Sequence, residues 1–419
     1  MSGHLWLPYT QMKTAPAPLH VVRTEGARIE LADGRVLLDG IASWWTACHG
    51  YNHPRIADAV RRQLDLVPHV MFAGLVHEPA LALAGRLVGM LAGSAPRLER
   101  VFFTESGSVA VEVAMKMAVQ ASLNRGRRRT RFVSFRDGYH GDTFATMSVC
   151  DPDGGMHARF AGVLPAQITA ELPRDDASEA ALDALLGRHA HEVAAILVEP
   201  LVQGAGGMVF HAADTLRRVR RLADRHGVLL IADEIFTGFG RTGAMFACQA
   251  AGIAPDIMTL SKALTGGTLP LAATVASAEV FAAFWSDDPG AALMHGPTYM
   301  ANPLACAAAL ASLALFDEEP RLAQVRALSA ALSRGLEPCR ALPNVRDVRV
   351  LGAIGVVELE HAPGEAGTAD LHTLRQRFVA AGVWLRPFGR IVYLTPAFTL
   401  DADEIDTLTA AVRAVLAAG

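Results

Sequence analysis

The middle of the chain alternates short apolar runs with stretches that have helical periodicity. The predicted strands are Val101–Thr104, Arg131–Phe135, Val193–Val198, Val228–Ala232 and Ile257–Leu260. One helix is predicted from about Ser108 and another over Thr215–His226. Unbroken apolar strands separated by helices are typical of a mainly parallel sheet that is covered on both faces. The pattern therefore predicts an α/β fold, in which ligands bind beyond the carboxyl ends of the strands.

The pattern changes beyond about residue 310. Helices are predicted at 305–316, 322–336 and 405–418, and short strands at 353–359, 383–385 and 391–394. Near the amino terminus, Ala27–Leu38 predicts a β-hairpin that turns at Asp33-Gly34. We therefore expect three parts. They are an N-terminal segment (1–55) that packs with the small domain, a large cofactor-binding domain (56–309) and a small α+β domain (310–419).

Composition and charge argue against several classes of partner. The 419 residues are 51% hydrophobic and carry a net charge of −4, so no basic field favours nucleic acid. We interpret the basic cluster Arg125–Arg129 as a solvated turn. The five cysteines include no CxxC pair, and the longest apolar stretch, Pro303–Phe316, is too short for a membrane span. With no signal-peptide pattern in residues 1–20, we expect a cytoplasmic protein that acts on small molecules.

Two residues indicate pyridoxal-phosphate (PLP) chemistry. Lys262 lies among small residues, and Asp233 closes the predicted strand Val228–Ala232. A lysine amine can form a Schiff base with the cofactor aldehyde, and an aspartate can hold the pyridinium nitrogen protonated. Glu199, Asp233 and Lys262 each follow a predicted strand, where an α/β sheet binds ligands. Either Lys262 or Asp233 alone means little, but together they point to an aminotransferase.

Two loops next to predicted strands have both a binding and a structural interpretation. Thr104–Ser108 precedes a helix, so its backbone N–H groups suit a phosphate, although an ordinary N-cap explains it as well. Tyr139 in the second loop can stack on a flat cofactor or be a partly buried turn residue. His140 and Asp142 suggest a metal site or a triad, but the chain has neither an HExxH nor a GxSxG pattern. We therefore predict no metal.

Other candidates for binding also have plain structural alternatives. The pair Trp44-Trp45 forms either a substrate wall or a domain interface. Arg386 can clamp a substrate carboxylate or simply be solvated. Arg241 lies within the glycine-rich loop Gly238–Gly243 and can reach substrate or form an ion pair. Thr298 can donate to a phosphate or lie in a turn.

Taken together, these segments resemble the class III, fold-type I, PLP-dependent aminotransferases. The motifs are Ser-Gly-Ser (106–108), Tyr-His-Gly-Asp-Thr (139–143), Asp-Glu-Ile-Phe-Thr-Gly-Phe-Gly-Arg-Thr-Gly (233–243), Ser-Lys-Ala-Leu-Thr-Gly-Gly (261–267) and His-Gly-Pro-Thr-Tyr-Met-Ala-Asn-Pro (295–303). The resemblance runs from about residue 8 to residue 398. It implies a mainly parallel, seven-stranded sheet in the large domain, pyridoxal 5'-phosphate as cofactor and a homodimer with shared active sites.

The resemblance also implies roles for individual residues. Lys262 binds the cofactor and moves the proton, Asp233 pairs with the pyridinium nitrogen, and Tyr139 stacks on the ring. The phosphate is bound by Gly107, Ser108 and Thr298, with Thr298 coming from the other subunit of the dimer. The substrate-binding set is Tyr9, Trp44, Trp45, Tyr139, Gly296 and Arg386, with Arg241 a weaker candidate. Arg386 is expected to hold the carboxylate of the keto substrate, and Glu199 has no assigned role.

Several stretches are far from generic in the class. They are Trp6–Met12, Ser43–Pro54, Met71–Pro79, Gly107–Met117 and Arg386–Gly389. These stretches resemble the branch that works in biotin biosynthesis, which implies ping-pong amino transfer from S-adenosylmethionine to 8-amino-7-oxononanoate. Lysine as donor, a general ω-aminotransferase and a PLP-dependent decarboxylase, mutase or racemase stay open as alternatives. Phe236 stands where the family has a small residue, so it can narrow the cleft and affect the donor.

Overall fold

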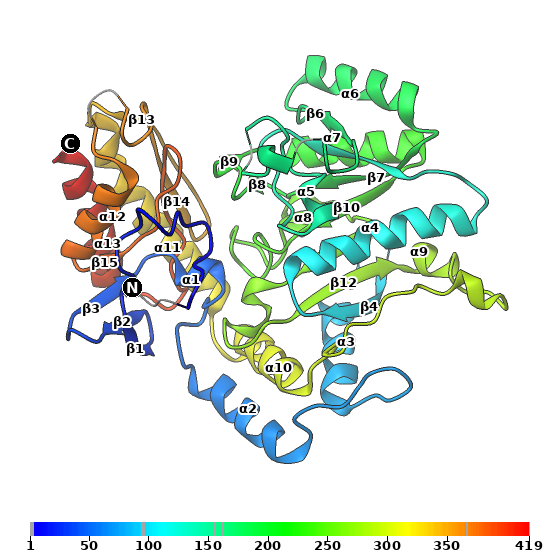
Figure 1. The fold of residues 1–419 in the computed structure, drawn as a ribbon, viewed down its shortest axis with the longest axis horizontal. Helices are drawn as coiled ribbons and strands as arrows, with labels where there is room; N and C mark the ends of the chain where they lie inside the picture. Colours follow the sequence, from blue (N-terminus) through cyan, green and yellow to red (C-terminus); the bar gives the residue numbers. More distant parts are fainter. Residues whose placement is uncertain (1–3, 94–96, 155, 161, 366–367, 419) are drawn as a thin grey trace.

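The computed structural model describes residues 4–93, 97–154, 156–160, 162–365 and 368–418. The middle of the chain forms one body, and the two ends of the chain come together in a second body beside it (Figure 1). No helix in the described ranges is long and apolar enough to cross a membrane.

The larger body is built on a seven-stranded sheet. In spatial order its strands are β4 (Leu98–Thr104), β12 (Ala272–Ser277), β11 (Ile257–Leu260), β10 (Leu229–Asp233), β7 (Val193–Val198), β5 (Arg131–Phe135) and β6 (Ile168–Ala170). Only β12 runs antiparallel to its neighbours, and the other pairings are parallel. The α/β fold with a mainly parallel, seven-stranded sheet is therefore confirmed.

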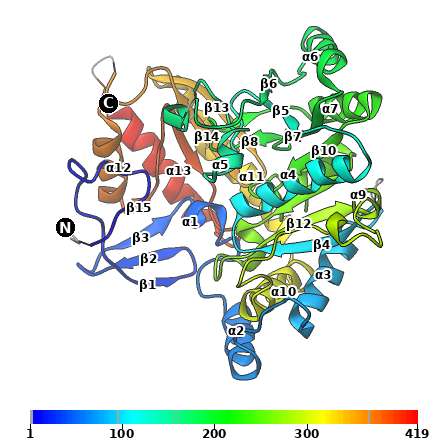
Figure 2. The same cartoon turned by 45° about the vertical axis from the view of Figure 1, so that its right-hand side comes forward.

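Helices cover both faces of this sheet, which explains the unbroken apolar strands (Figure 2). Alternate residues of one strand enter two different cores, because successive strand side chains point to opposite faces. Ile231 of β10 packs with buried residues of α4 (Gly107–Asn124). Its neighbours Leu230 and Ala232 join the core that contains α7 (Ala213–His226). The remaining helices of this body are α2 (Pro54–Leu66), α3 (Glu78–Met90), α5 (Phe144–Met147), α6 (Asp176–His189), α8 (Ala247–Ala251), α9 (Ala278–Ala282) and α10 (Pro303–Glu318).

The second body joins the amino-terminal hairpin to the carboxyl-terminal part of the chain. Its four-stranded sheet has the order β1 (Val21–Glu25), β2 (Arg28–Leu31), β3 (Val36–Asp39) and β15 (Val383–Trp384). A three-stranded sheet has the order β13 (Val345–Leu351), β14 (Ile354–Leu359) and β16 (Ile391–Leu394). The helices are α11 (Arg321–Leu336), α12 (Leu371–Ala380) and α13 (Ala402–Ala417). Because β3 pairs with β15, the hairpin is held to residues more than 300 positions away.

The segment α1 (Ala42–Trp45) leads from the second body towards the first. Its four residues have φ values between 45° and 73°, a conformation that residues with a β-carbon rarely adopt. Lys262, at the start of the 3₁₀ turn η2 (Lys262–Thr265), has a φ of 46°. Backbone strain of this kind is often found at functional sites, where the surrounding structure maintains it.

Candidate active site

A cavity lies at the carboxyl ends of the parallel strands, where the sheet topology predicts ligand binding. Glu199 follows β7, Asp233 ends β10 and Lys262 follows β11. All three line this cavity, together with Trp45, Ser106, Gly107, Ser108, Tyr139, His140, Ile235 and Phe236. Residues from six separate segments of the chain therefore meet at one place.

Lys262 is the only lysine at the cavity, and its amine is held among aromatic rings. Nζ lies 4.5 Å from the ring centre of Trp45 and 5.9 Å from that of Phe236. Burial lowers the pKa of Lys262 from 10.5 to about 8, although the charges of Asp233 and Glu199 act in the opposite direction. The amine of Lys262 therefore becomes neutral and nucleophilic at a lower pH than the amine of a solvent-exposed lysine does.

Asp233 is fixed in place by both of its carboxylate oxygens. Oδ2 accepts a hydrogen bond from Nδ1 of His140 at 2.8 Å, and Oδ1 accepts from the hydroxyl of Thr259 at 3.2 Å. Asp233 and His140 are both buried. Burial acts to lower the pKa of His140, but the hydrogen bond and the charge of Asp233 outweigh it and raise the pKa. These contacts favour the protonated form of His140 and hold its ring against the carboxylate of Asp233.

The loop after β5 is held by two carboxylates. Glu199 accepts hydrogen bonds from the backbone N–H groups of Tyr139 and Gly204, both at 2.9 Å. Burial raises the pKa of Glu199 to about 7. The hydroxyls of Tyr139 and Tyr9 both donate to Asp142, the former at 2.9 Å. These contacts connect the amino-terminal segment that carries Tyr9 with the cavity wall.

An aromatic wall extends from the cavity to an unpaired cation. Trp44 lies edge-on to Tyr9, with ring centres 6.0 Å apart, and Cζ of Arg386 lies 5.3 Å from the Trp44 ring. No carboxylate in the described residues pairs with Arg386. Phe236 packs on Trp45, with ring centres 4.4 Å apart. Aromatic rings that lead from the cavity to a guanidinium without a carboxylate partner suit a ligand with a carbon chain and a carboxylate.

Six predicted binding residues are not among those that line the cavity. Tyr9, Trp44 and Arg386 form the wall described above, and Gly296, Thr298 and Arg241 lie elsewhere in this chain. Gly296 and Thr298 are exposed and are not among the residues that line the cavity. Arg241 is buried and donates from Nη1 to the carbonyls of Ala353 and Pro396, at 3.2 and 2.8 Å. Its guanidinium therefore ties the glycine-rich loop to the second body, instead of bordering the cavity.

The cavity fits a flat, phosphorylated cofactor. Ser106 is the N-cap of α4 and accepts from the backbone N–H of Val109, so Gly107 and Ser108 form the first turn, where an anion is favoured. A β-carbon at Gly107 would lie 3.0 Å from Ile235, and one at Gly141 would lie 2.2 Å from Oγ of Ser108. The absence of side chains at these glycines leaves room between α4, Asp233 and Lys262. The N-cap at Ser106 therefore does not exclude the binding of an anion by the first turn of α4.

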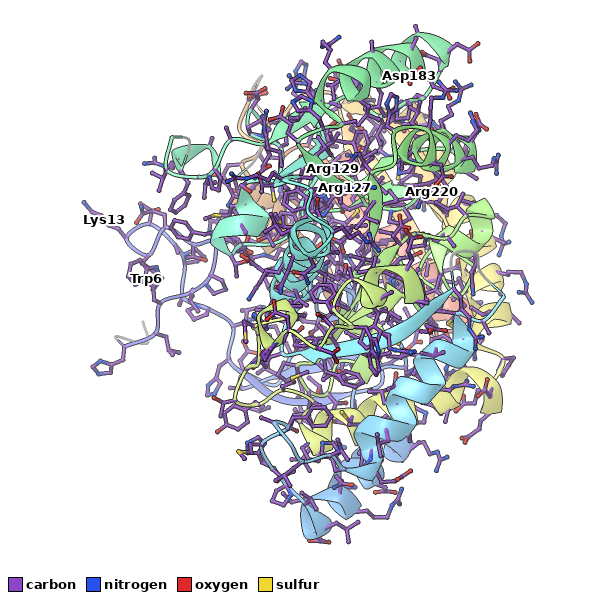
Figure 3. The ribbon with its side chains drawn as sticks, turned by 90° about the vertical axis from the view of Figure 1, so that its right-hand side faces the viewer. Trp6, Lys13, Arg127, Arg129, Asp183 and Arg220 are labelled. Carbon is purple, nitrogen blue, oxygen red and sulfur yellow. The ribbon has the colours of Figure 1, made fainter. Side chains whose placement is uncertain are left out.

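The basic cluster lies at the amino ends of the strands, opposite the carboxyl ends where the cavity lies. Arg127, Arg129 and Arg220 surround a hollow near the amino ends of β5, β7 and β10 (Figure 3). Arg220 pairs with Asp224 and Asp256, and Arg129 donates to the carbonyl of Gly227. Within the described residues, no group of three or more His, Cys, Asp and Glu side chains is arranged to hold a metal ion.

Sequence reasoning gave no role to two residues at this site. His140 is the partner of Asp233, and Asp142 is the shared acceptor of Tyr9 and Tyr139. Both lie close to Tyr139 in the sequence, so their position in that loop could have marked them as candidates for the site. Their partners could not be inferred, because Asp233 is 93 positions from His140 and Tyr9 is 133 positions from Asp142.

Comparisons with known proteins agree on one family. The model for "Aminotransferase class-III" matches residues 9–416. An adenosylmethionine-8-amino-7-oxononanoate aminotransferase from Corynebacterium glutamicum is 44% identical over 99% of this chain and 96% of its own length. The crystal structure of the enzyme of that name from Methanocaldococcus jannaschii superposes with a TM-score of 0.92, at 32% identity, over 99% of this chain and 97% of that one. An amine transaminase from an uncultivated Pseudomonas species, in its PLP-bound form, has a TM-score of 0.91 at 34% identity over 99% and 98%.

Proposed function

The chain belongs to the class III aminotransferases, and from this premise we propose that it makes 7,8-diaminononanoate for biotin biosynthesis. The amino group comes from S-adenosylmethionine, which leaves as a keto acid, and 8-amino-7-oxononanoate receives it. The fold alone does not separate this reaction from those of other amine transaminases, because both kinds of structure superpose almost equally well. The observation that carries the proposal is the aromatic wall of Tyr9 and Trp44 that ends at the unpaired guanidinium of Arg386.

PLP is the cofactor that the family implies, and the cavity residues fit it. When bound, it supplies an aldehyde that takes up the amino group and a ring that withdraws electrons from the reacting carbon. Lys262 would hold the aldehyde, Asp233 the ring nitrogen, and Gly107 and Ser108 the phosphate. Tyr139 would lie against the ring, in a loop that Glu199 anchors through backbone hydrogen bonds.

Lys262 also provides the base. With the cofactor bound, Nζ of Lys262 would take the proton from the substrate carbon and give it back later in the reaction. The lowered pKa, about 8, keeps a useful fraction of the amine neutral near neutral pH. His140 donates a hydrogen bond to Asp233 and so orients the carboxylate that would keep the ring nitrogen of the bound cofactor protonated.

The second substrate explains why an apolar wall and a cation occur together. 8-Amino-7-oxononanoate carries its reacting carbonyl and its carboxylate at opposite ends of a hydrocarbon chain. The wall of Tyr9 and Trp44, together with Trp45 in the cavity, would cover that chain, while Arg386 would bind the carboxylate with two parallel hydrogen bonds. Both substrates use the same site in turn, so the kinetics should be ping-pong.

A homodimer would complete the site. Thr298 and Gly296 are exposed in the single chain, as residues that serve a second subunit would be. Trp6 is 89% exposed on the amino-terminal segment, which lies along one side of the body (Figure 3). Burial of such a residue against another copy would be favourable.

We further propose that residues 1–55 and 310–419 act as one small domain beside the large domain, 56–309. We also propose that the enzyme is cytoplasmic.

Turnover with single donors tests the proposal. The purified PLP form is incubated with 8-amino-7-oxononanoate and either S-adenosylmethionine or lysine, and 7,8-diaminononanoate is measured by mass spectrometry. Product with S-adenosylmethionine alone is the expected result. Product with lysine alone would keep the acceptor and change the donor, whereas amino transfer only between simple ω-amines and keto acids would indicate a general ω-aminotransferase. Consumption of an amino acid without any transfer would indicate a decarboxylase, mutase or racemase.

A further inference from the structure

A chain of buried polar side chains lies behind the turn that carries Lys262, outside the residues that line the cavity. Arg321 donates from Nε to Nδ1 of His49 at 3.0 Å, and Nε2 of His49 lies 3.1 Å from the hydroxyl of Ser312. Ser312, in α10, donates to the carbonyl of Ala263 at 3.3 Å. The three side chains are 3% exposed or less. The amino-terminal segment, α10 and α11 thus all connect to the residue next to Lys262.

The hydrogen bonds in this chain can run in only one direction. A guanidinium is always a donor, so Nδ1 of His49 must accept from Arg321. Burial and the nearby charge of Arg321 lower the pKa of His49 to about 3, so the ring is neutral and its proton lies on Nε2. Nε2 therefore donates to the Ser312 hydroxyl, which directs its own proton to the Ala263 carbonyl.

The outer end of the chain is firmly held. The other two guanidinium nitrogens of Arg321 pair with Glu319 at 2.8 Å and with the side-chain oxygen of Gln324 at 2.7 Å. The ring of His49 packs edge-on against Phe316, with ring centres 5.0 Å apart. A buried polar network whose members are all paired is rigid, and it specifies one arrangement.

The inner end of the chain contacts a strained turn. Lys262 has a φ of 46°, which a residue with a side chain rarely adopts. The same turn ends at Gly266, where an added β-carbon would lie 3.4 Å from His49 and 3.5 Å from the Ser312 hydroxyl. Both side chains therefore pack directly against the turn. Strained backbone persists only where its surroundings hold it.

We propose that Arg321, His49 and Ser312 are positioning residues that hold the turn of Lys262 in its left-handed conformation and so place the reacting amine. None of the three touches the reacting atoms. They act through the carbonyl of Ala263, and they make the geometry of the amine depend on how α11 is packed. The inference rests on the proposed function only for its kinetic readout.

Ser312→Ala tests the proposal with the smallest change. The matched control is Ser122→Ala, because Ser122 is also a buried helical serine whose hydroxyl donates to a carbonyl, that of Arg127, at 3.1 Å. Release of PLP from the purified holoenzyme is followed by the loss of visible absorbance in the presence of a PLP scavenger. Loss of one hydrogen bond should speed release about threefold to tenfold in Ser312→Ala and leave Ser122→Ala unchanged. In turnover, kcat should fall by a similar factor while KM for the donor stays within about twofold.

His49 variants separate hydrogen bonding from shape. Glutamine can accept from Arg321 and donate to Ser312, so His49→Gln should stay near the parent, whereas His49→Leu should release PLP at least as fast as Ser312→Ala. If Ser312→Ala and Ser122→Ala release PLP at the same rate, the proposal is wrong. It is also wrong if His49→Gln is as impaired as a folded His49→Leu. If His49→Leu does not fold, the serine pair decides alone. PLP release needs no substrate, so an error in the proposed donor or acceptor would leave this readout intact.

Discussion

In the cofactor-free protein we expect the amine of Lys262 to lose its proton near pH 8, and not near the ordinary 10.5, because burial disfavours its charged form. This lower pKa greatly increases the unprotonated fraction of the amine near neutral pH. At about pH 7.5, a group with a pKa of about 8 is about one quarter unprotonated, whereas one with a pKa of 10.5 is about one thousandth unprotonated. Only the unprotonated amine can attack an aldehyde, so the site gains roughly 250-fold in reactive amine.

Competitive acetylation across a range of pH measures this directly. The chain contains only three lysines, Lys13, Lys116 and Lys262, so each can be followed by mass spectrometry. Lys13 is exposed on the amino-terminal segment (Figure 3) and serves as the internal reference. Lys262 should reach half of its maximal labelling about two pH units before a solvated amine does.

A matched variant gives the sign of the electrostatic contribution. The carboxylate of Asp233 raises the pKa of Lys262, so Asp233→Asn should move the midpoint of Lys262 to still lower pH and leave Lys13 unchanged. A midpoint above about pH 10 for Lys262 in the parent would refute the reasoning, because burial would then have no net effect on the amine.

Variants at three further positions probe the cavity and the aromatic wall beside it. Phe236→Ala removes the ring that packs on Trp45, so the enzyme should gain turnover of bulky amines such as 1-phenylethylamine; no gain would show that this ring does not limit the cleft. Arg386→Leu should raise KM for 8-amino-7-oxononanoate by about tenfold to a hundredfold, with partial recovery in Arg386→Lys, and an unchanged KM would exclude it as the carboxylate site. His140→Ala leaves an oxygen of buried Asp233 unpaired, at a cost of about 1–3 kcal/mol, so PLP affinity measured by titration should fall about tenfold or more; equal affinity would contradict the pairing.

Much of the fold could be predicted because its strands are locally distinct. The run Val193–Val198 is apolar throughout and Ile257–Leu260 is interrupted only by a threonine, and the structure shows strands over the same residues. Lys262 and Asp233 could be selected because each directly follows or closes such a run, and the structure brings them into one cavity. Residues within a few positions of a strand end can be expected to lie together in the fold, because the carboxyl ends of parallel strands meet at one edge of the sheet.

What could not be predicted depends on contacts between distant residues. Strand β12, Ala272–Ser277, is half alanine and has little intrinsic strand preference. It nevertheless lies inside the sheet and runs antiparallel to both of its neighbours. The left-handed backbone of Ala42–Trp45 has no glycine to signal it. The buried position of Arg241 depends on carbonyls of Ala353 and Pro396, which are more than 100 positions away. Thr298 is exposed in the single chain, so its expected role depends on a second subunit.

The most direct test of the proposed reaction is a half-reaction with the purified PLP form. S-adenosylmethionine alone, and lysine alone in a parallel sample, are added while the visible absorbance of the Lys262-bound cofactor is recorded. The account predicts that S-adenosylmethionine removes this absorbance, that lysine does not, and that 8-amino-7-oxononanoate restores it. Loss of the absorbance with lysine would contradict the proposed donor. If neither compound acts but a simple ω-amine does, the biotin reaction itself is contradicted.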